Sequence, residues 1–218
     1  MSKRSNYILF SLILISLSCN RASRTFIPAA QIPVENTPVI LPSAQDSSTV
    51  SPAAAYKDFL EDYIINKGSI GPIRIGMTIR QADSLLTAFK KQDALAVDFG
   101  FGGGSPAFIY SYEDQPVLAL VQALNTKKIF ALVAISEHLK TTNEVRPQMT
   151  VEELLSIYPG MLFYQDIMNN WEYAEDPLNN WSFVFITDKK SMIGTYPVAE
   201  KPSRPKNMTA RNAWITIQ

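Results

Sequence analysis

Two stretches of the chain share one order of hydrophobic and polar positions. A short β-like run that contains proline is followed by Met-Thr and then by apolar residues at helical spacing. The first stretch, GPIRIGMTIRQADSLL, begins at Gly71, and the second, EVRPQMTVEELLSIYP, begins at Glu144. A threonine followed three residues later by glutamine or glutamate is a capping box, which marks the start of a helix. The pattern therefore predicts two helices, one capped by Thr78 and the other by Thr150.

The apolar positions behind each threonine repeat with the period of an α-helix. They are Ile79, Ala82, Leu85, Leu86 and Phe89 in the first stretch and Val151, Leu154, Leu155 and Tyr158 in the second. A helix with one such stripe packs against its neighbours through a single face. Pro159-Gly160 marks the end of the second helix.

Strand-like runs follow both predicted helices. After the first come AFIYSY, PVLALVQAL and KIFALVAIS, separated by turns at Glu113-Asp114-Gln115 and Asn125-Thr126-Lys127. After the second come MLFYQ, WEYA, WSFVFIT and AWITIQ. The segment before the first helix, YIINKGSIGPIRIGM, indicates two more short strands around a turn. Because the connections are short, neighbouring strands are expected to be antiparallel.

These elements predict an α+β fold with two tandem repeats, each a helix plus three or four antiparallel strands. The first repeat covers residues 60–137 and the second covers residues 141–218, within a single domain over 56–218. One helix and three strands form a poor core alone. We therefore expect the repeats to form one sheet with both helices on one face. The alternative is that the shared Met-Thr pattern is a coincidence.

The amino terminus, MSKRSNYILFSLILISLSCNR, has the order of a secretory signal. Lys3 and Arg4 precede a short apolar run, and small or apolar residues precede Cys19. The run is shorter than the ~20 residues that span a bilayer. Cys19 is the only cysteine, so it forms no internal disulfide. Residues 1–18 are therefore predicted to be a signal peptide.

Residues 19–55 show no hydrophobic period and are rich in proline and serine. Such a segment buries too little apolar surface to offset the entropy of ordering it. Proline favours extended conformations, so we expect a disordered tether that reaches about 30 Å. A segment without any function would look the same.

Charge is balanced, with 20 basic and 20 acidic residues. Loss of Lys3 and Arg4 with the signal leaves 18 basic against 20 acidic residues. A nucleic-acid partner is therefore not expected, because such proteins carry a basic face.

No group of residues predicts catalysis, a metal or a cofactor. The Gly-rich segment DFGFGGGS, from Asp98 to Ser105, lacks the Lys-Ser/Thr of a phosphate loop and leads into a strand. His138 is the only histidine, and no G-x-S-x-G motif supplies a serine for it. The acidic pairs are neighbours in sequence, so their side chains point apart on a strand. We expect a protein that is not an enzyme.

Aromatic residues alternate along three of the predicted strands. Since both helices are expected on one side of the sheet, the other side must meet water or a partner, and Tyr and Trp are typical of protein-binding surfaces. Core packing is the alternative for these residues. The hypothesis is that at least three of five aromatic residues are partly exposed on one binding surface. The five are Tyr110, Tyr112, Trp171, Tyr173 and Trp181.

Two resemblances extend this reading. The context of Cys19 resembles the lipobox of bacterial lipoproteins of the looser Bacteroidota type, with Ser16 where leucine is usual, which implies that Cys19 is acylated. The helix starts resemble those of the SmpA/OmlA-like outer-membrane assembly lipoproteins and of the tandem-repeat β-lactamase inhibitory protein. Gly71, Gly76, Met77 and Thr78 match that pattern, whereas the second copy has Gln148 where glycine is expected. This resemblance implies a non-enzymatic binding fold.

The residues after Cys19 are Asn-Arg-Ala-Ser. By resemblance to other lipoproteins, the missing Asp after Cys19 implies a lipid-anchored outer-membrane protein. The missing acidic cluster, which would favour surface export in Bacteroidota lipoproteins, implies that it faces the periplasm. The expected function is a membrane-tethered module that binds an envelope protein. The alternative is a small-ligand carrier or hydrolase-type envelope enzyme that uses the Gly-rich loop and a cleft between the repeats.

Overall fold

The computed structural model describes residues 59–198 and 201–218. The predicted signal peptide, the tether and Cys19 lie outside these residues. Among the described residues, no helix has both the length and the apolar character needed to cross a bilayer.

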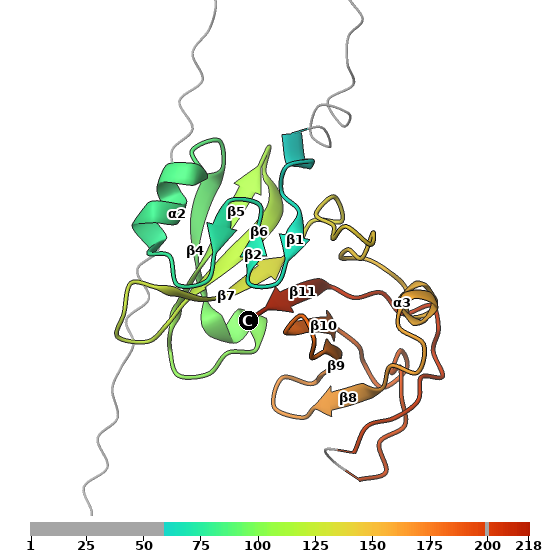
Figure 1. Cartoon of the computed structure of the whole chain (residues 1–218). Helices are drawn as coiled ribbons and strands as arrows, with labels where there is room; N and C mark the ends of the chain where they lie inside the picture. The colour runs from blue at the N-terminus through green and yellow to red at the C-terminus, as the bar shows by residue number, and fades with distance from the viewer. Residues whose placement is uncertain (1–58, 199–200) are drawn as a thin grey trace, which may run out of the picture. The chain divides into compact units, whose positions relative to one another are not determined.

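An antiparallel sheet of eight strands runs through the described part of the chain (Figure 1). In spatial order its strands are β4 (Lys90–Leu95), β5 (Pro106–Tyr112), β6 (Gln115–Gln122), β7 (Ile129–Ala134), β11 (Trp214–Ile217), β10 (Trp181–Phe185), β9 (Trp171–Asp176) and β8 (Phe163–Asp166). Strand β11 follows β10 in the chain and lies between β7 and β10 in space, where it joins the two halves of the sheet. The turns predicted at Glu113–Asp114 and Asn125 are confirmed, since all three residues adopt a positive φ.

A second, three-stranded sheet precedes the large one in the sequence. It consists of β1 (Ile65–Asn66), β2 (Ser69–Ile70) and β3 (Ile73–Arg74). The helical elements with described bounds are α2 (Ile79–Leu85), the 3-10 helix η1 (Ala96–Phe99) and α3 (Val151–Ile157). The small sheet lies in front of β6 and β7 in Figure 1, whereas α2 and α3 lie at opposite ends of the view.

Both α-helices begin with the predicted capping box, which is confirmed. The hydroxyl of Thr78 accepts a hydrogen bond from the Gln81 N–H at 3.2 Å, and the Thr78 N–H donates to Gln81 Oε1 at 2.9 Å. In α3 the Thr150 N–H donates to Glu153 Oε2 at 2.6 Å, and the Glu153 N–H donates to the Thr150 hydroxyl at 3.1 Å. Each box satisfies backbone donors that have no partner inside the helix.

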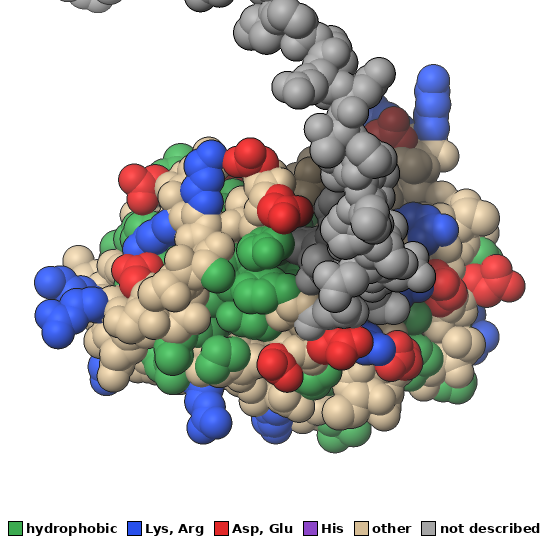
Figure 2. Space-filling model, turned by 90° about the horizontal axis from the view of Figure 1, so that it is seen from above, with side chains coloured by type: hydrophobic (Ala, Val, Ile, Leu, Met, Phe, Trp, Pro, Cys, Tyr) green, Lys and Arg blue, Asp and Glu red, His purple; other side chains and the backbone are tan. Residues whose placement is uncertain are grey.

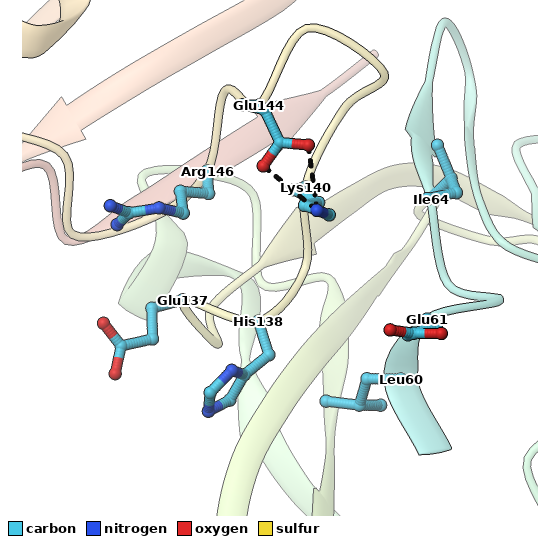
Figure 3. A pocket seen from close by; sticks show the side chains of 8 residues that line it. All are labelled: Leu60, Glu61, Ile64, Glu137, His138, Lys140, Glu144 and Arg146. Atoms are coloured by element: carbon cyan, nitrogen blue, oxygen red, sulfur yellow. Dashed lines mark hydrogen bonds and ion pairs between the residues drawn. The ribbon is translucent and has the colours of Figure 1, made fainter. Parts of the chain in front are cut away.

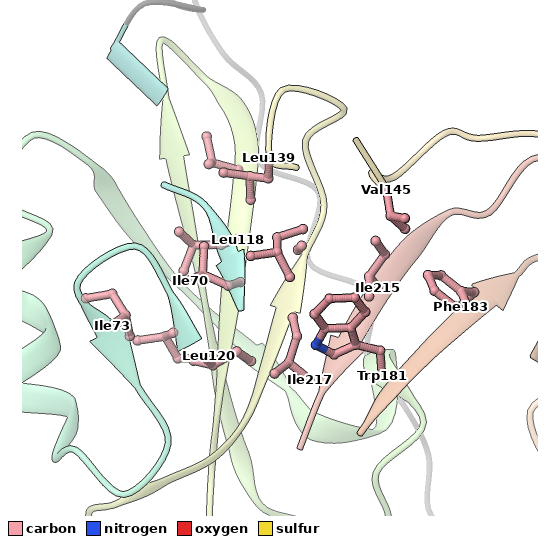
Figure 4. Close-up of a cluster of buried hydrophobic side chains, with 14 of the residues drawn as sticks. Ile70, Ile73, Leu118, Leu120, Leu139, Val145, Trp181, Phe183, Ile215 and Ile217 are labelled. Atoms are coloured by element: carbon pink, nitrogen blue, oxygen red, sulfur yellow. The ribbon is translucent and has the colours of Figure 1, made fainter. Parts of the chain in front are cut away.

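The large sheet buries a different hydrophobic cluster on each side. The larger cluster contains Leu118, Leu120, Phe183, Ile215 and Ile217 from the sheet (Figure 4). The small sheet and both helices cover this side, because residues of β1, β2, β3, α2 and α3 belong to the same cluster. The second cluster is smaller and consists mainly of alanine, valine and aromatic side chains, with η1 packed on it.

The predicted fold class, α+β with two tandem repeats of a helix and three or four strands, is wrong. The described chain is mostly β, with antiparallel sheets of three and eight strands, and α2 and α3 have seven residues each. The halves also differ, because the small sheet and η1 belong to the first half. In the second half, the described residues between β10 and β11 form no helix or strand. A capping box determines how a helix starts, but it does not determine which strands pair.

Candidate binding groove

Three of the five aromatic residues predicted to form a binding surface lie on the covered side of the sheet. Tyr110 is 1% exposed, and Trp181 is 7% exposed. Tyr112 is half-buried, and its ring stacks on Phe59 with centroids 4.5 Å apart. The prediction that at least three of the five share one exposed surface is therefore wrong. The alternation along a strand shows which residues share a face, but it does not show which face is covered.

Tyr110 also has a polar role inside the covered side. Its hydroxyl donates a 2.6 Å hydrogen bond to Asp83 Oδ1 of α2, and Lys91 Nζ of β4 donates to the same oxygen at 2.9 Å. Burial, followed by the hydrogen bond to Asp83, raises the pKa of Tyr110 well above its ordinary value. Lys91 Nζ lies 4.2 Å from the centroid of the Phe108 ring. These contacts attach α2 to the edge of the sheet.

Trp171 and Tyr173 lie on the other side of the sheet, and both are half-buried. They are two residues apart on β9, so they point to the same face. The Trp171 ring meets Trp214 edge to face at 5.2 Å, and Tyr173 stacks on Tyr164 of β8 at 5.4 Å. Aromatic neighbours hold both rings in place while one side of each stays accessible.

Trp171 and Tyr173 form one wall of a hollow with a volume of about 180 Å³. A second hollow of about 330 Å³ shares four residues with it, namely Glu175, Ser182, Thr216 and Gln218. We call the two together the aromatic groove. Its further lining consists of Phe99, Gly100, Phe101, Asp166 and Val184 in the first hollow and Asp176, Pro177, Asn180 and Trp181 in the second.

The Gly-rich segment supplies part of this wall. Gly100 adopts φ +85° at the end of η1, and a Cβ there would lie 2.6 Å from Cζ2 of Trp171. Phe101, the next residue, meets Phe130 of β7 edge to face at 4.9 Å. The segment then leads into β5, as the sequence predicted. Its glycine therefore allows close packing of Trp171 against the backbone.

Two hairpin turns of the same construction border the groove, and the sequence reasoning missed them. The motif Asp-x-x-Asn-Asn-Trp occurs at residues 166–171 and again at 176–181. In each turn the Asp accepts a 2.7 Å hydrogen bond from the side-chain amide of the first Asn, and the second Asn adopts φ +56°. The repeated motif was a readable signal for two hairpins. It would have placed Asp166 and Asp176 at opposite ends of β9.

Asp166 is held in its charged form by its turn. Partial burial acts to raise the pKa of Asp166, but hydrogen bonds from the Asn169 side chain and backbone outweigh it and lower that pKa below its ordinary value. The pKa of Tyr173 is raised by burial and then by the nearby carboxylates of Glu175 and Asp166. Both carboxylates therefore act on the hydroxyl of Tyr173. The groove combines aromatic faces with negative charge.

A separate hollow of about 360 Å³ lies outside the aromatic groove, between the segment before β1 and the loop after β7 (Figure 3). It is lined by Leu60, Glu61, Ile64, Glu137, His138, Lys140, Glu144 and Arg146. Lys140 Nζ is paired with Glu144 Oε1 at 2.8 Å. These lining residues include no serine, threonine or cysteine that His138 could activate as a nucleophile. Among the described residues, no cluster of His, Cys, Asp and Glu could hold a metal ion.

The surface seen from above mixes both signs of charge (Figure 2). Lysine and arginine side chains alternate with acidic ones, and hydrophobic side chains gather between acidic groups on this view. The described part of this face therefore carries no continuous basic patch of the kind that nucleic acids need.

Comparisons with known proteins bear on the fold alone. No family model matches the chain, and no curated protein matches its sequence. Among solved structures, it is similar to the crystal structure of the uncharacterized protein yfeY from Escherichia coli. The TM-score is 0.51 and the sequence identity is 10%, over 71% of this chain and 98% of that chain. The resemblance to SmpA/OmlA-like lipoproteins gains no support from these comparisons and stays a prediction.

Proposed function

We propose that this chain is a non-enzymatic, membrane-tethered module of the bacterial envelope that binds another protein through the aromatic groove. The observation that carries the proposal is the position of Trp171 and Tyr173, half-buried side by side on one face of the sheet. The opposite face is covered by the small sheet and both helices. Half-buried Trp and Tyr held rigid by their neighbours are typical centres of protein-binding surfaces.

The anchoring half of the proposal comes from the sequence. The signal-like start, Cys19 and the Pro- and Ser-rich segment behind it favour a lipid-anchored protein on the periplasmic face of the outer membrane. A tether of that length lets the domain reach a partner in the envelope. The lining of the hollow beside His138 favours binding over catalysis, because it holds no serine, threonine or cysteine that the imidazole could activate.

Site-specific photo-crosslinking in intact cells tests the proposal. A benzoylphenylalanine placed at Tyr173 keeps an aromatic ring in the groove and should link the chain to a defined envelope protein. The matched control carries the same group at Leu124, which is 53% exposed in the turn between β6 and β7. No linked protein at Tyr173, or the same linked proteins from both positions, would contradict the proposed function.

A second candidate function is a small-ligand carrier that uses the hollow beside His138. Its volume of about 360 Å³ falls within the range of small-molecule sites. Native mass spectrometry of the protein purified from its own cells would show a bound molecule of constant mass. An Ile64→Trp variant, which changes a partly exposed lining residue, should fill the hollow and lose the bound molecule, whereas Tyr173→Ala should retain it.

A further inference from the structure

No ion pair of the described residues neutralises the acidic side chains of the aromatic groove. Asp166 and Glu175 line it, and no lysine or arginine does. Asp176 also lines its second hollow, but it is 5% exposed and accepts hydrogen bonds from Leu178 and Asn179. The ion pairs of the described residues involve other acids, namely Asp83, Asp114, Glu144 and Glu153. Lys67 reaches the turn beside the second hollow, but its Nζ donates to the carbonyl oxygen of Leu178 at 3.0 Å. A ligand that fills the groove should therefore bring positive charge.

The aromatic walls suit the same ligand. A lysine or arginine side chain is attracted to the face of a Trp or Tyr ring, and a nearby carboxylate strengthens the contact. The chain builds such an arrangement on its covered side, where Lys91 lies over the Phe108 ring and pairs with Asp83. Glu175 is two residues from Tyr173 on the same face of β9, and it is exposed. It is therefore free to pair with a cation over the Tyr173 ring.

The shape of the groove points to a peptide segment rather than to a free amine. Its floor crosses β11, β10 and β9 through Thr216, Ser182 and Glu175. Three strands span about 10 Å, which is the length of about three extended residues. Ser182 and Thr216 on this floor carry hydroxyl groups, which can donate to or accept from a peptide backbone.

We propose that the groove binds an extended, arginine- or lysine-bearing segment of the partner protein, with one basic side chain placed between Tyr173 and Glu175. This inference rests on the proposed function and names the chemistry of its partner. Negative charge in the groove repels phosphate groups, so nucleic acids and anionic lipid head groups are excluded as occupants.

Fluorescence anisotropy with defined peptides tests the inference. The probe is a fluorescein-labelled hexapeptide of alternating glycine and arginine. Its control has citrulline at each arginine position, which keeps the shape and removes the charge. The full chain, in neutral detergent micelles, should bind the arginine peptide at least tenfold more tightly than the citrulline peptide. The difference should shrink at high salt, because exposed charges are screened.

Matched variants locate the binding. Glu175→Gln should lower the affinity for the arginine peptide about fivefold, and Glu175→Lys should lower it at least tenfold. Glu113→Gln changes another exposed glutamate, in the turn between β5 and β6, and should leave binding unchanged. The inference is overturned if both peptides bind equally, or if Glu175→Gln and Glu113→Gln have the same effect.

The outcomes also separate this inference from the proposed function. If crosslinking at Tyr173 captures a defined protein but the arginine peptide binds no better than its control, the groove binds a protein segment of other chemistry. The inference that this segment is basic is then wrong. If the peptide binds as expected but Tyr173 captures no protein in cells, the chemistry of the groove stands and the protein-binding function fails.

Discussion

The hydroxyl of Tyr196 donates a 2.6 Å hydrogen bond to the carboxylate of Glu172. Glu172 lies on β9 and is 1% exposed. The same carboxylate accepts hydrogen bonds from the backbone N–H groups of Ile193 and Gly194, at 2.8 and 2.9 Å, and from the Thr187 hydroxyl at 2.6 Å. Burying a carboxylate is costly unless its lone pairs are satisfied. Here one segment, residues 187–196, supplies all four donors, so Glu172 attaches that segment to the sheet.

The first prediction is that Glu172→Gln destabilises the protein by about 3 kcal/mol. The amide keeps the shape but loses the charge, and its NH2 group would face donors instead of acceptors. Urea melts followed by circular dichroism measure the loss. Glu175→Gln, an exposed change on the same strand, should stay within about 0.5 kcal/mol. Equal losses in the two variants would show that the hydrogen bonds to Glu172 contribute little.

The second prediction uses the two capping boxes, which differ in charge. The partner of Thr78 is the neutral Gln81, whereas the partner of Thr150 is Glu153. Hydrogen bonds from the backbone N–H of Thr150 and then from its hydroxyl lower the pKa of Glu153 below its ordinary value of 4.5. Because this pKa is depressed in the folded state, the stabilisation is present above about pH 4.5 and is lost as the pH falls through the folded pKa.

Thr78→Ala and Thr150→Ala should each cost about 1 kcal/mol near pH 7. At a pH below the folded pKa of Glu153 the loss from Thr150→Ala should be smaller, because Glu153 is then protonated in the folded state as well. The loss from Thr78→Ala should not change between the two pH values. Urea melts of both variants and of the wild type at each pH measure this. The same pH dependence in both variants would contradict the assignment of the charge to Glu153.

Local features of this fold could be predicted from the sequence. The capping boxes at Thr78 and Thr150 involve residues three apart, so their signal lies within a few positions. The strands around Leu118, Leu132 and Phe183 are apolar runs bounded by turn residues, and all of them are present. Strand β4 was missed because its sequence, KKQDAL, has no apolar alternation. It is an edge strand, where charged side chains are typical.

Long-range features could not be predicted in the same way. The place of β11 between β7 and β10 depends on pairings between Ile215 and Ala134 and between Ile215 and Phe183. No local pattern encodes such pairings. The side on which an aromatic residue lies depends on what covers the sheet, which explains why Tyr110 and Trp181 were placed wrongly. Trp171 and Tyr173 were named from the same alternation, but the packing of Gly100 against Trp171 becomes visible only in three dimensions.

The third prediction concerns the membrane anchor. Cys19 lies outside the described residues, and its lipobox-like context predicts acylation of its thiol. Cys19→Ser should abolish palmitate incorporation and release the protein from the membrane fraction, because serine offers no thiol to the acyl donor. Ser16→Ala, which changes the same segment but keeps the thiol, should still be labelled. Labelling that persists in Cys19→Ser would contradict the prediction.

The fourth prediction concerns the contact between Gly100 and Trp171. Gly100→Ala should destabilise the protein by about 2 to 4 kcal/mol for two physical reasons. The residue has φ +85°, which an alanine rarely adopts, and its Cβ would lie 2.6 Å from Cζ2 and 3.3 Å from Cη2 of the Trp171 ring. Trp214 packs on the same ring at 5.2 Å, so the ring cannot shift without losing that contact.

The control is Gly102→Ala in the same segment. Gly102 has no positive φ, and a Cβ there would meet nothing within 4 Å. That change should be neutral or should stabilise the protein by about 0.5 kcal/mol, because it reduces the freedom of the unfolded chain. Thermal and urea melts compare the two variants. Since Trp171 forms a wall of the aromatic groove, Gly100→Ala should also shift the tryptophan fluorescence emission and lower the affinity for the arginine peptide. Equal stability of the two variants would show that Trp171 does not need a glycine beside it.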